Sequence, residues 1–118
     1  MRIKRGVTSH RRHKKVLAMT KGHRATRHSL YRRAKESMLH ALRYAYAHRR
    51  ERKGDMRRLW ILRVSAASRA QGLTYSQFIN GLKKSGVEIN RKMLADMAVR
   101  EPEDFANLVT IAKGKVQS

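Results

Sequence analysis

Six histidines are the side chains in this sequence best suited to metal binding or acid–base chemistry. They are His10, His13, His23, His28, His40 and His48. His10 and His13 share a helical spacing, but no cysteine or nearby carboxylate completes a set of metal ligands. Most of these histidines flank arginine-rich stretches, where an imidazole ring can make polar or stacking contacts with a nucleic acid. We therefore expect neither a metal nor a cofactor.

The acidic side chains give no sign of catalysis either. The sequence holds eight of them, and helix capping or surface ion pairing accounts for most. It has no glycine-rich phosphate loop of the nucleotide-binding type. It also has no cysteine, which excludes disulfides and thiolate sites. We predict that the chain is not an enzyme.

Positive charge dominates the sequence, with 29 Lys and Arg against 8 acids, a formal net charge of +21 and a pI of about 11.6. Residues 1–58 contain 20 cations and 3 acids, whereas residues 59–118 contain 9 and 5. Arginine can bind phosphate with two donors, and tyrosine can stack on unpaired bases. The first half is therefore predicted to bind a nucleic acid. The candidate RNA-binding residues are Arg2, Lys4, Arg5, His10, Arg11, Arg12, His13, Lys14, Lys15, Lys21, His23, Arg24, Arg27, Tyr31, Arg32, Arg33, Tyr44, Arg49, Arg50, Arg52, Lys53, Arg57 and Arg58.

Two helices are expected to position these side chains. A short one is capped by Ser9 and ends near Met19. A long one occupies residues 25–53, which lack Gly and Pro and are rich in helix-forming residues; Thr26 or Ser29 caps it. We expect Gly54 to kink or interrupt the long helix. Its narrow apolar stripe consists of Leu30, Ala34, Met38, Ala41, Leu42 and Ala45. Without RNA, residues 1–58 should be largely disordered.

Residues 59–118 are expected to form a compact domain of four helices. The first runs from about Met56 to Ala70 and ends at Gly72. Trp60 is interpreted as a core residue because its neighbours are apolar, with stacking on an RNA base as the alternative. The inward face of this helix is predicted to consist of Leu59, Leu62, Ala66 and Ala70, with Ile61 and Val64 beside it.

The other three helices carry their own start signals. Thr74 and Gln77 form a capping-box pattern, Asn90 is an N-cap, and Pro102 suits a first helical position. The last helix is expected to stop at Gly114. Their predicted inward residues are Phe78, Ile79, Leu82, Met93, Leu94, Met97, Ala98, Phe105, Leu108, Val109 and Ala112. The predicted fold class is all-α: an extended basic N-terminal arm with a long helix, residues 1–58, followed by a small four-helix globular domain, residues 59–118.

Two other interpretations of the sequence remain open. The helices expected over residues 75–84 and 91–99, with a glycine-containing turn between them, superficially resemble a helix-turn-helix, so a DNA-binding regulator is an alternative function. Most of the charge, however, lies in the arm.

The acid-free residues 1–35 also fit an organelle transit peptide. No apolar run approaches the roughly 18 residues of a membrane span, so we expect no membrane association.

The centre of the chain resembles the signature of the bacterial large-subunit ribosomal protein L20 family. The signature residues are Lys53, Arg57, Leu59-Trp60-Ile61, Arg63-Val64-Ser65 and Arg69. The resemblance extends on both sides, to Lys4-Arg5-Gly6, His13-Lys14-Lys15, Lys21-Gly22, Tyr44-Ala45-Tyr46, Arg49-Arg50, the run from Tyr75 to Lys84 and the run from Val87 to Asp96. It covers nearly the whole chain.

This resemblance implies a structural component of the large ribosomal subunit, located in the cytoplasm within the ribosome. Members of the family bind 23S ribosomal RNA directly and act early in subunit assembly, without taking part in peptide-bond chemistry. The implied partners are 23S ribosomal RNA and neighbouring large-subunit proteins. Some members also bind their own messenger RNA and repress its translation. The residues alone indicate only a basic helical nucleic-acid-binding protein.

Overall fold

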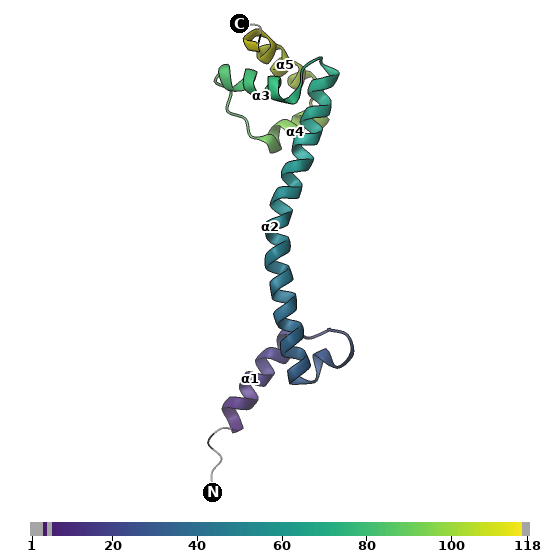
Figure 1. The fold of residues 1–118 in the computed structure, drawn as a ribbon, viewed down its shortest axis with the longest axis vertical. Coiled ribbons are helices and arrows are strands. Elements are labelled where there is room, and N and C mark those ends of the chain that lie inside the picture. Colours follow the sequence, from purple (N-terminus) through teal and green to yellow (C-terminus); the bar gives the residue numbers. More distant parts are fainter. Residues whose placement is uncertain (1–3, 5, 117–118) are drawn as a thin grey trace. The chain divides into compact units, whose positions relative to one another are not determined.

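The computed structural model describes residue 4 and residues 6–116; this part of the chain consists of helices joined by short turns and loops, without a strand, as the sequence predicts (Figure 1). Its elements are α1 (Gly6–Met19), a 3₁₀ turn η1 (Ala25–His28), α2 (Tyr31–Ala70), α3 (Tyr75–Lys84), α4 (Arg91–Arg100) and α5 (Pro102–Val116). The chain divides into two compact units. We call Met1–Glu51 the arm unit and Arg52–Ser118 the C-terminal unit. Helix α2 contributes to both.

In the arm unit, α1 begins at Gly6, so Ser9 lies inside the helix instead of capping it. At the other end of α1, the buried Thr20 hydroxyl donates to the carbonyl oxygens of Val16 and Leu17, at 3.4 and 3.2 Å. These hydrogen bonds satisfy the Thr20 hydroxyl, whose burial without a partner would destabilise the protein. Gly22 then adopts a φ of +86°, which favours glycine and turns the chain towards η1.

Two expectations about the long helix are wrong. It starts at Tyr31, because residues 25–28 form the separate 3₁₀ turn η1, so neither Thr26 nor Ser29 caps it. It also continues through Gly54 to Ala70 without interruption (Figure 1). A glycine inside a helix costs only about 1 kcal/mol relative to alanine, and helix-forming residues on both sides outweigh that cost.

The predicted apolar stripe of α2 is mostly exposed. Ala34 is buried and Met38 is half-buried, but Leu30 and Leu42 remain exposed. No other element of the arm unit is long enough to cover the whole stripe, since α1 and η1 contain 14 and 4 residues. Much of the surface of α2 in this unit is therefore open to solvent.

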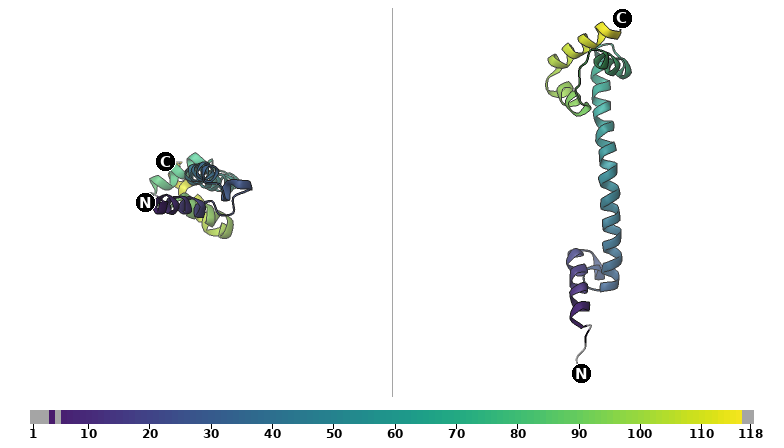
Figure 2. Two further views of the ribbon diagram at one scale, coloured as in Figure 1. Left: turned by 90° about the horizontal axis from the view of Figure 1, so that it is seen from below. Right: turned by 90° about the vertical axis from the view of Figure 1, so that its left-hand side faces the viewer.

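In the C-terminal unit, the last turns of α2 pack against α3, α4 and α5, which gather beside them (Figure 2). The core contains Val64, Leu73, Phe78, Leu82, Leu94, Ala95, Phe105, Val109 and Ala112. The rings of Phe78 and Phe105 lie 5.2 Å apart between centroids, in a tilted arrangement that aromatic pairs prefer.

The predicted inward face of α2 in this unit is wrong. Val64 is buried with Trp60 and Ala67 packed beside the core, whereas Leu62 is 67% exposed and Leu59, Ala66 and Ala70 also face solvent. Apolar residues recur at helical spacing on both faces, so periodicity alone does not choose between them. The buried Ser68 also lies on the true inward face, where its hydroxyl donates to the Ser65 carbonyl at 3.1 Å.

The predicted helix caps are largely confirmed. Thr74 and Gln77 form the reciprocal capping box at the start of α3, and the Asn90 side chain accepts from the Met93 N–H at 2.9 Å. Gly72 and Gly86 have φ values of +84° and +71°, and each follows a helix that ends in a Schellman pattern of backbone hydrogen bonds. Helix α5 starts at Pro102 but continues through Gly114 to Val116, so Gly114 does not stop it.

The geometry of α3 and α4 differs from a helix-turn-helix. Six residues, 85–90, separate the two helices, whereas the motif has a turn of three or four residues. Helix α5 packs most extensively against α3 and also against α4. The two helices are thus held together through a third helix that follows them in the chain.

Candidate nucleic-acid interface

The predicted RNA-binding residues are distributed along the whole arm unit and the adjoining part of α2. Arg2 and Arg5 lie outside the described residues. Helix α1 carries six of the candidates, from His10 to Lys15. Lys21, His23 and Arg24 lie in the connection to η1, and Arg27 lies on η1 itself. Every candidate from Tyr31 to Arg58 lies on α2. Apart from His13, His23 and Tyr31, which are half-buried, the described candidates are exposed.

Few of these cations are engaged by acids. Within the described part of the chain, the ion pairs in this region join Arg33 to Glu36 at 3.9 Å and Arg58 to Asp55 at 3.5 Å. Both pairs are exposed, and such pairs hold their partners only weakly. The remaining basic side chains are therefore available to neutralise phosphates.

Aromatic rings accompany the cations at defined positions. The His13 ring on α1 stacks on Tyr31 at the start of α2, with 3.8 Å between centroids and 24° between planes. Along α2, Tyr44 stacks with His40 at 6.5 Å and with His48 at 5.9 Å. We call His40, Tyr44 and His48 the ring ladder. Tyr44 is 59% exposed, so part of the ladder faces solvent.

The sequence prediction included Tyr44 in the interface but omitted His40 and His48. The signal for both was their distance of four residues from Tyr44, which brings side chains together on one face of a helix.

Another aromatic contact joins Arg50 to Tyr46, one helical turn earlier on α2. The Arg50 Nε donates to the Tyr46 hydroxyl at 2.8 Å, and the guanidinium carbon lies 5.1 Å from the centre of the same ring. The cation–π contact and the hydrogen bond restrict the Arg50 side chain while leaving its charge unpaired by any acid in the described residues. Arg50 is thereby held in one orientation on the exposed surface of α2.

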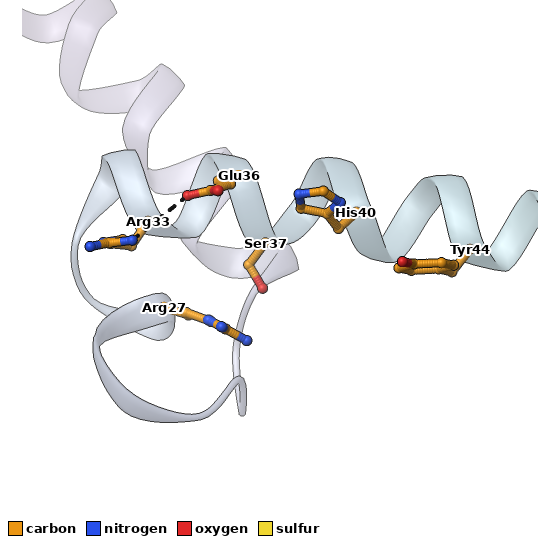
Figure 3. A pocket seen from close by; sticks show the side chains of 6 residues that line it. All are labelled: Arg27, Arg33, Glu36, Ser37, His40 and Tyr44. Carbon is orange, nitrogen blue, oxygen red and sulfur yellow. Dashed lines mark ion pairs between the residues drawn. The ribbon is translucent and has the colours of Figure 1, made fainter.

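A surface pocket of about 320 Å³ lies where η1 meets α2 (Figure 3). It is lined by Arg27, Arg33, Glu36, Ser37, His40 and Tyr44. Arg27 extends from η1 towards Ser37 on α2. Ser37 is in turn hydrogen-bonded to Nδ1 of His23 at 2.7 Å. The volume is at the lower end of the range of about 300–1,000 Å³ typical of small-ligand sites.

Two further observations concern other kinds of site. Among residue 4 and residues 6–116, no three His, Asp or Glu side chains lie close enough together to hold a metal ion. Over the same residues, no helix has both the length and the apolar character needed to cross a membrane.

The all-helical fold and the concentration of cations and stacked rings in the arm unit are typical of proteins that bind nucleic acids. Residues 2–108 match the sequence profile of the ribosomal protein L20 family. The chain is 66% identical over 105 residues to the large ribosomal subunit protein bL20 of Dehalococcoides mccartyi. This alignment covers 89% of this chain and 88% of the relative. Identity to the bL20 proteins of Moorella thermoacetica and Thermomicrobium roseum is 58% over 115 residues and 57% over 113. These alignments cover 98% and 96% of this chain, and 95% and 97% of the relatives.

The chain therefore belongs to the ribosomal protein L20 family. Its relatives are structural proteins of the ribosome, and it is not an enzyme. The predicted family is confirmed over nearly the whole chain.

Proposed function

We propose that this ribosomal protein binds 23S ribosomal RNA directly through its arm unit and supports early assembly of the large subunit. The observation that carries the proposal is the surface of α1 and α2, where cations without an ion pair in the described residues lie among stacked rings, the half-buried His13–Tyr31 pair and the ring ladder. The relatives' name, large ribosomal subunit protein bL20, supports the same assignment. By this reading the protein works within the ribosome, in the cytoplasm.

The mechanism is charge neutralisation combined with base stacking. RNA segments that crowd together repel one another, and a fixed row of arginines and lysines replaces the diffuse counterions between them. Proteins recognise RNA chiefly at unpaired, splayed-out bases, which stack on aromatic and histidine rings. The ring ladder supplies such a surface among the cations, so it can select places where bases leave the helix. Holding those places in one arrangement would stabilise a tertiary fold of the RNA.

Other partners besides 23S ribosomal RNA are also considered for this protein. Neighbouring large-subunit proteins are expected around the C-terminal unit, where Leu62 exposes apolar surface. Repression of its own messenger RNA rests on the family resemblance alone. A DNA-binding regulator is the competing function, but the six residues between α3 and α4 do not favour it.

Competition binding at one salt concentration tests the proposal. We expect the purified chain to prefer folded 23S ribosomal RNA over duplex DNA of equal length. RNA should also remain intact in the presence of divalent metals and at several pH values. Equal or tighter binding to a duplex DNA would contradict the proposal and restore the regulator, and cleavage of the RNA would contradict a structural role.

A further inference from the structure

A second surface pocket lies entirely within the C-terminal unit, and none of the residues that line it was predicted to bind RNA. Its volume is about 510 Å³, which is within the range of small-ligand sites. Helix α2 contributes Trp60 and Arg63 to its lining. Helix α4 and its N-cap contribute Asn90, Lys92, Met93, Asp96 and Arg100. None of these residues has a role in the function proposed above.

The apolar part of the pocket comes from both helices. Trp60 packs against the core but is only partly buried, so part of its side chain is available in the pocket. Met93 was expected to point inward but is 55% exposed, and it lines the same pocket. An indole and a flexible thioether are well suited to a flat ring, because one stacks on it and the other adapts to it.

The polar part of the pocket favours an anion beside that ring. The acid in the lining, Asp96, forms an exposed ion pair with Arg100 at 3.0 Å, so the charges of these two side chains offset each other. Arg63 and Lys92 are exposed and have no ion pair within the described residues. The pocket therefore has two cations to offer to a ligand.

Asn90 adds a donor at a fixed position. Its side-chain oxygen accepts from the Met93 N–H at 2.9 Å, which holds the side chain in place at the start of α4. Its NH₂ group is left to donate to an acceptor in the pocket. Stacking surface, two cations and one oriented donor match the parts of a nucleotide: base, phosphate and base-edge acceptor.

We propose that this pocket binds one unpaired nucleotide of RNA, with the base stacked on Trp60 and the phosphate held by Arg63 and Lys92. The inference rests on the proposed function in that the ligand is RNA, but it locates a second point of attachment on a different unit of the protein. Trp60 would then have two roles, one side stabilising the core and the other contacting the RNA.

Trp60 is the only tryptophan in the chain, so its fluorescence reports on this pocket alone. The probes are adenosine, guanosine, cytidine and uridine 5′-monophosphates, with ribose 5-phosphate as the probe that lacks a base. All are titrated into the full chain with excitation selective for tryptophan. We expect saturable quenching by the nucleotides, strongest for the purines, and none by ribose 5-phosphate. Quenching that does not saturate, or that is equal with ribose 5-phosphate, would contradict base stacking.

Variants separate this pocket from general attraction to a basic protein. Replacing Arg63→Gln and Lys92→Gln together should raise the apparent Kd for adenosine 5′-monophosphate by about 5- to 50-fold, because two charge-assisted contacts are lost. The matched variant Lys83→Gln with Lys113→Gln removes the same charge from α3 and α5, outside the pocket, and should change the Kd less than 2-fold. Equal losses in both variants would show non-specific attraction and overturn the proposal.

A third variant removes the ring. Trp60→Leu keeps an apolar side chain against the core, and nuclear magnetic resonance of the backbone amides replaces fluorescence as the readout. In the wild-type chain, adenosine 5′-monophosphate should shift the amide signals of Lys92 and Met93; in Trp60→Leu, with a folded spectrum retained, these shifts should disappear. Unchanged shifts would contradict a role for the ring. If the pocket fails these tests while ribosomal RNA still binds through the arm unit, the proposed function stands and only this inference is wrong.

Discussion

Gly81 on α3 lies directly against the backbone of Ala112 on α5. A β-carbon placed on Gly81 would come within 2.6 Å of the Ala112 carbonyl oxygen and 2.8 Å of its Cα and Cβ atoms. These distances are far below normal contact, and the atoms concerned belong mostly to backbone, which cannot rotate aside. The absence of a side chain at Gly81 therefore allows α3 and α5 to approach closely, and Phe78 and Phe105 on the same two helices are in ring contact.

We predict that Gly81→Ala destabilises the C-terminal unit. Forcing the helices apart should lower the free energy of unfolding by about 1–3 kcal/mol as a net effect, after the gain of roughly 1 kcal/mol that alanine brings to a helix is included. Chemical unfolding followed by circular dichroism measures the difference. The control is Gly114→Ala in α5, where a β-carbon meets no atom within 4 Å. That variant should be as stable as the wild type or slightly more so; greater stability of Gly81→Ala would contradict the role of this contact.

The capping box at the start of α3 gives a second prediction. Thr74 Oγ1 accepts from the Gln77 N–H at 3.4 Å, and Gln77 Oε1 accepts from the Thr74 N–H at 3.1 Å. Thr74→Ala removes the first of these bonds and should lower the free energy of unfolding by about 1 kcal/mol. Ser76→Ala, in the first turn of the same helix and exposed like Thr74, is the matched control and should change the free energy of unfolding by less than about 0.5 kcal/mol. A smaller loss for Thr74→Ala than for Ser76→Ala would rule out the cap as a source of stability.

Local signals in the sequence predicted these caps because each depends on residues within a few positions of one another. Thr74, Asn90 and Pro102 act at the helix start that follows them, so the sequence contains all the necessary information. Gly54 and Gly114 misled the prediction because a glycine ends a helix only when the residues beyond it favour another conformation.

The face of α2 could not be predicted in the same way. Choosing Val64 over Leu62 as the buried residue depends on which side α3, α4 and α5 occupy, and those helices are distant in sequence. The candidate site shows the same division. The charge of the arm is a property of composition and was predicted, whereas the pocket beside Trp60 depends on where α4 packs and was missed.

The ring ladder gives a third prediction. If Tyr44 stacks on an RNA base, Tyr44→Leu should weaken binding to 23S ribosomal RNA by about 1–3 kcal/mol, the usual contribution of one base–aromatic stack. Tyr44→Phe keeps the ring and should bind like the wild type. Leu42→Ala removes exposed apolar surface from the opposite side of α2 and should have a smaller effect than Tyr44→Leu. Filter binding or fluorescence anisotropy at a fixed salt concentration measures all four proteins. Equal affinities for Tyr44→Leu and Tyr44→Phe would mean that the ring does not stack on RNA.

The last prediction concerns the salt dependence of RNA binding. Binding through about six to ten phosphate contacts should weaken roughly 10³- to 10⁵-fold between about 50 and 200 mM salt, on a scale derived from duplex DNA. Four exposed cations on α1, none of them in an ion pair within the described residues, are Arg11, Arg12, Lys14 and Lys15. Changing all four to glutamine should weaken binding and reduce the magnitude of the slope of log K against log salt by about 3–4. The slope falls because the counterions at each lost phosphate contact are no longer released on binding.

The matched variant for this test changes four exposed lysines of the C-terminal unit to glutamine: Lys83, Lys84, Lys113 and Lys115. It alters the net charge of the protein by the same amount, so any effect of total charge is common to both variants. Circular dichroism should first show that the C-terminal unit of each remains folded. Because the arm unit carries the main interface in our proposal, the α1 variant must lose more affinity and more slope than the lysine variant. The reverse order would move the main RNA site to the C-terminal unit, and equal losses would mean that only the total charge matters.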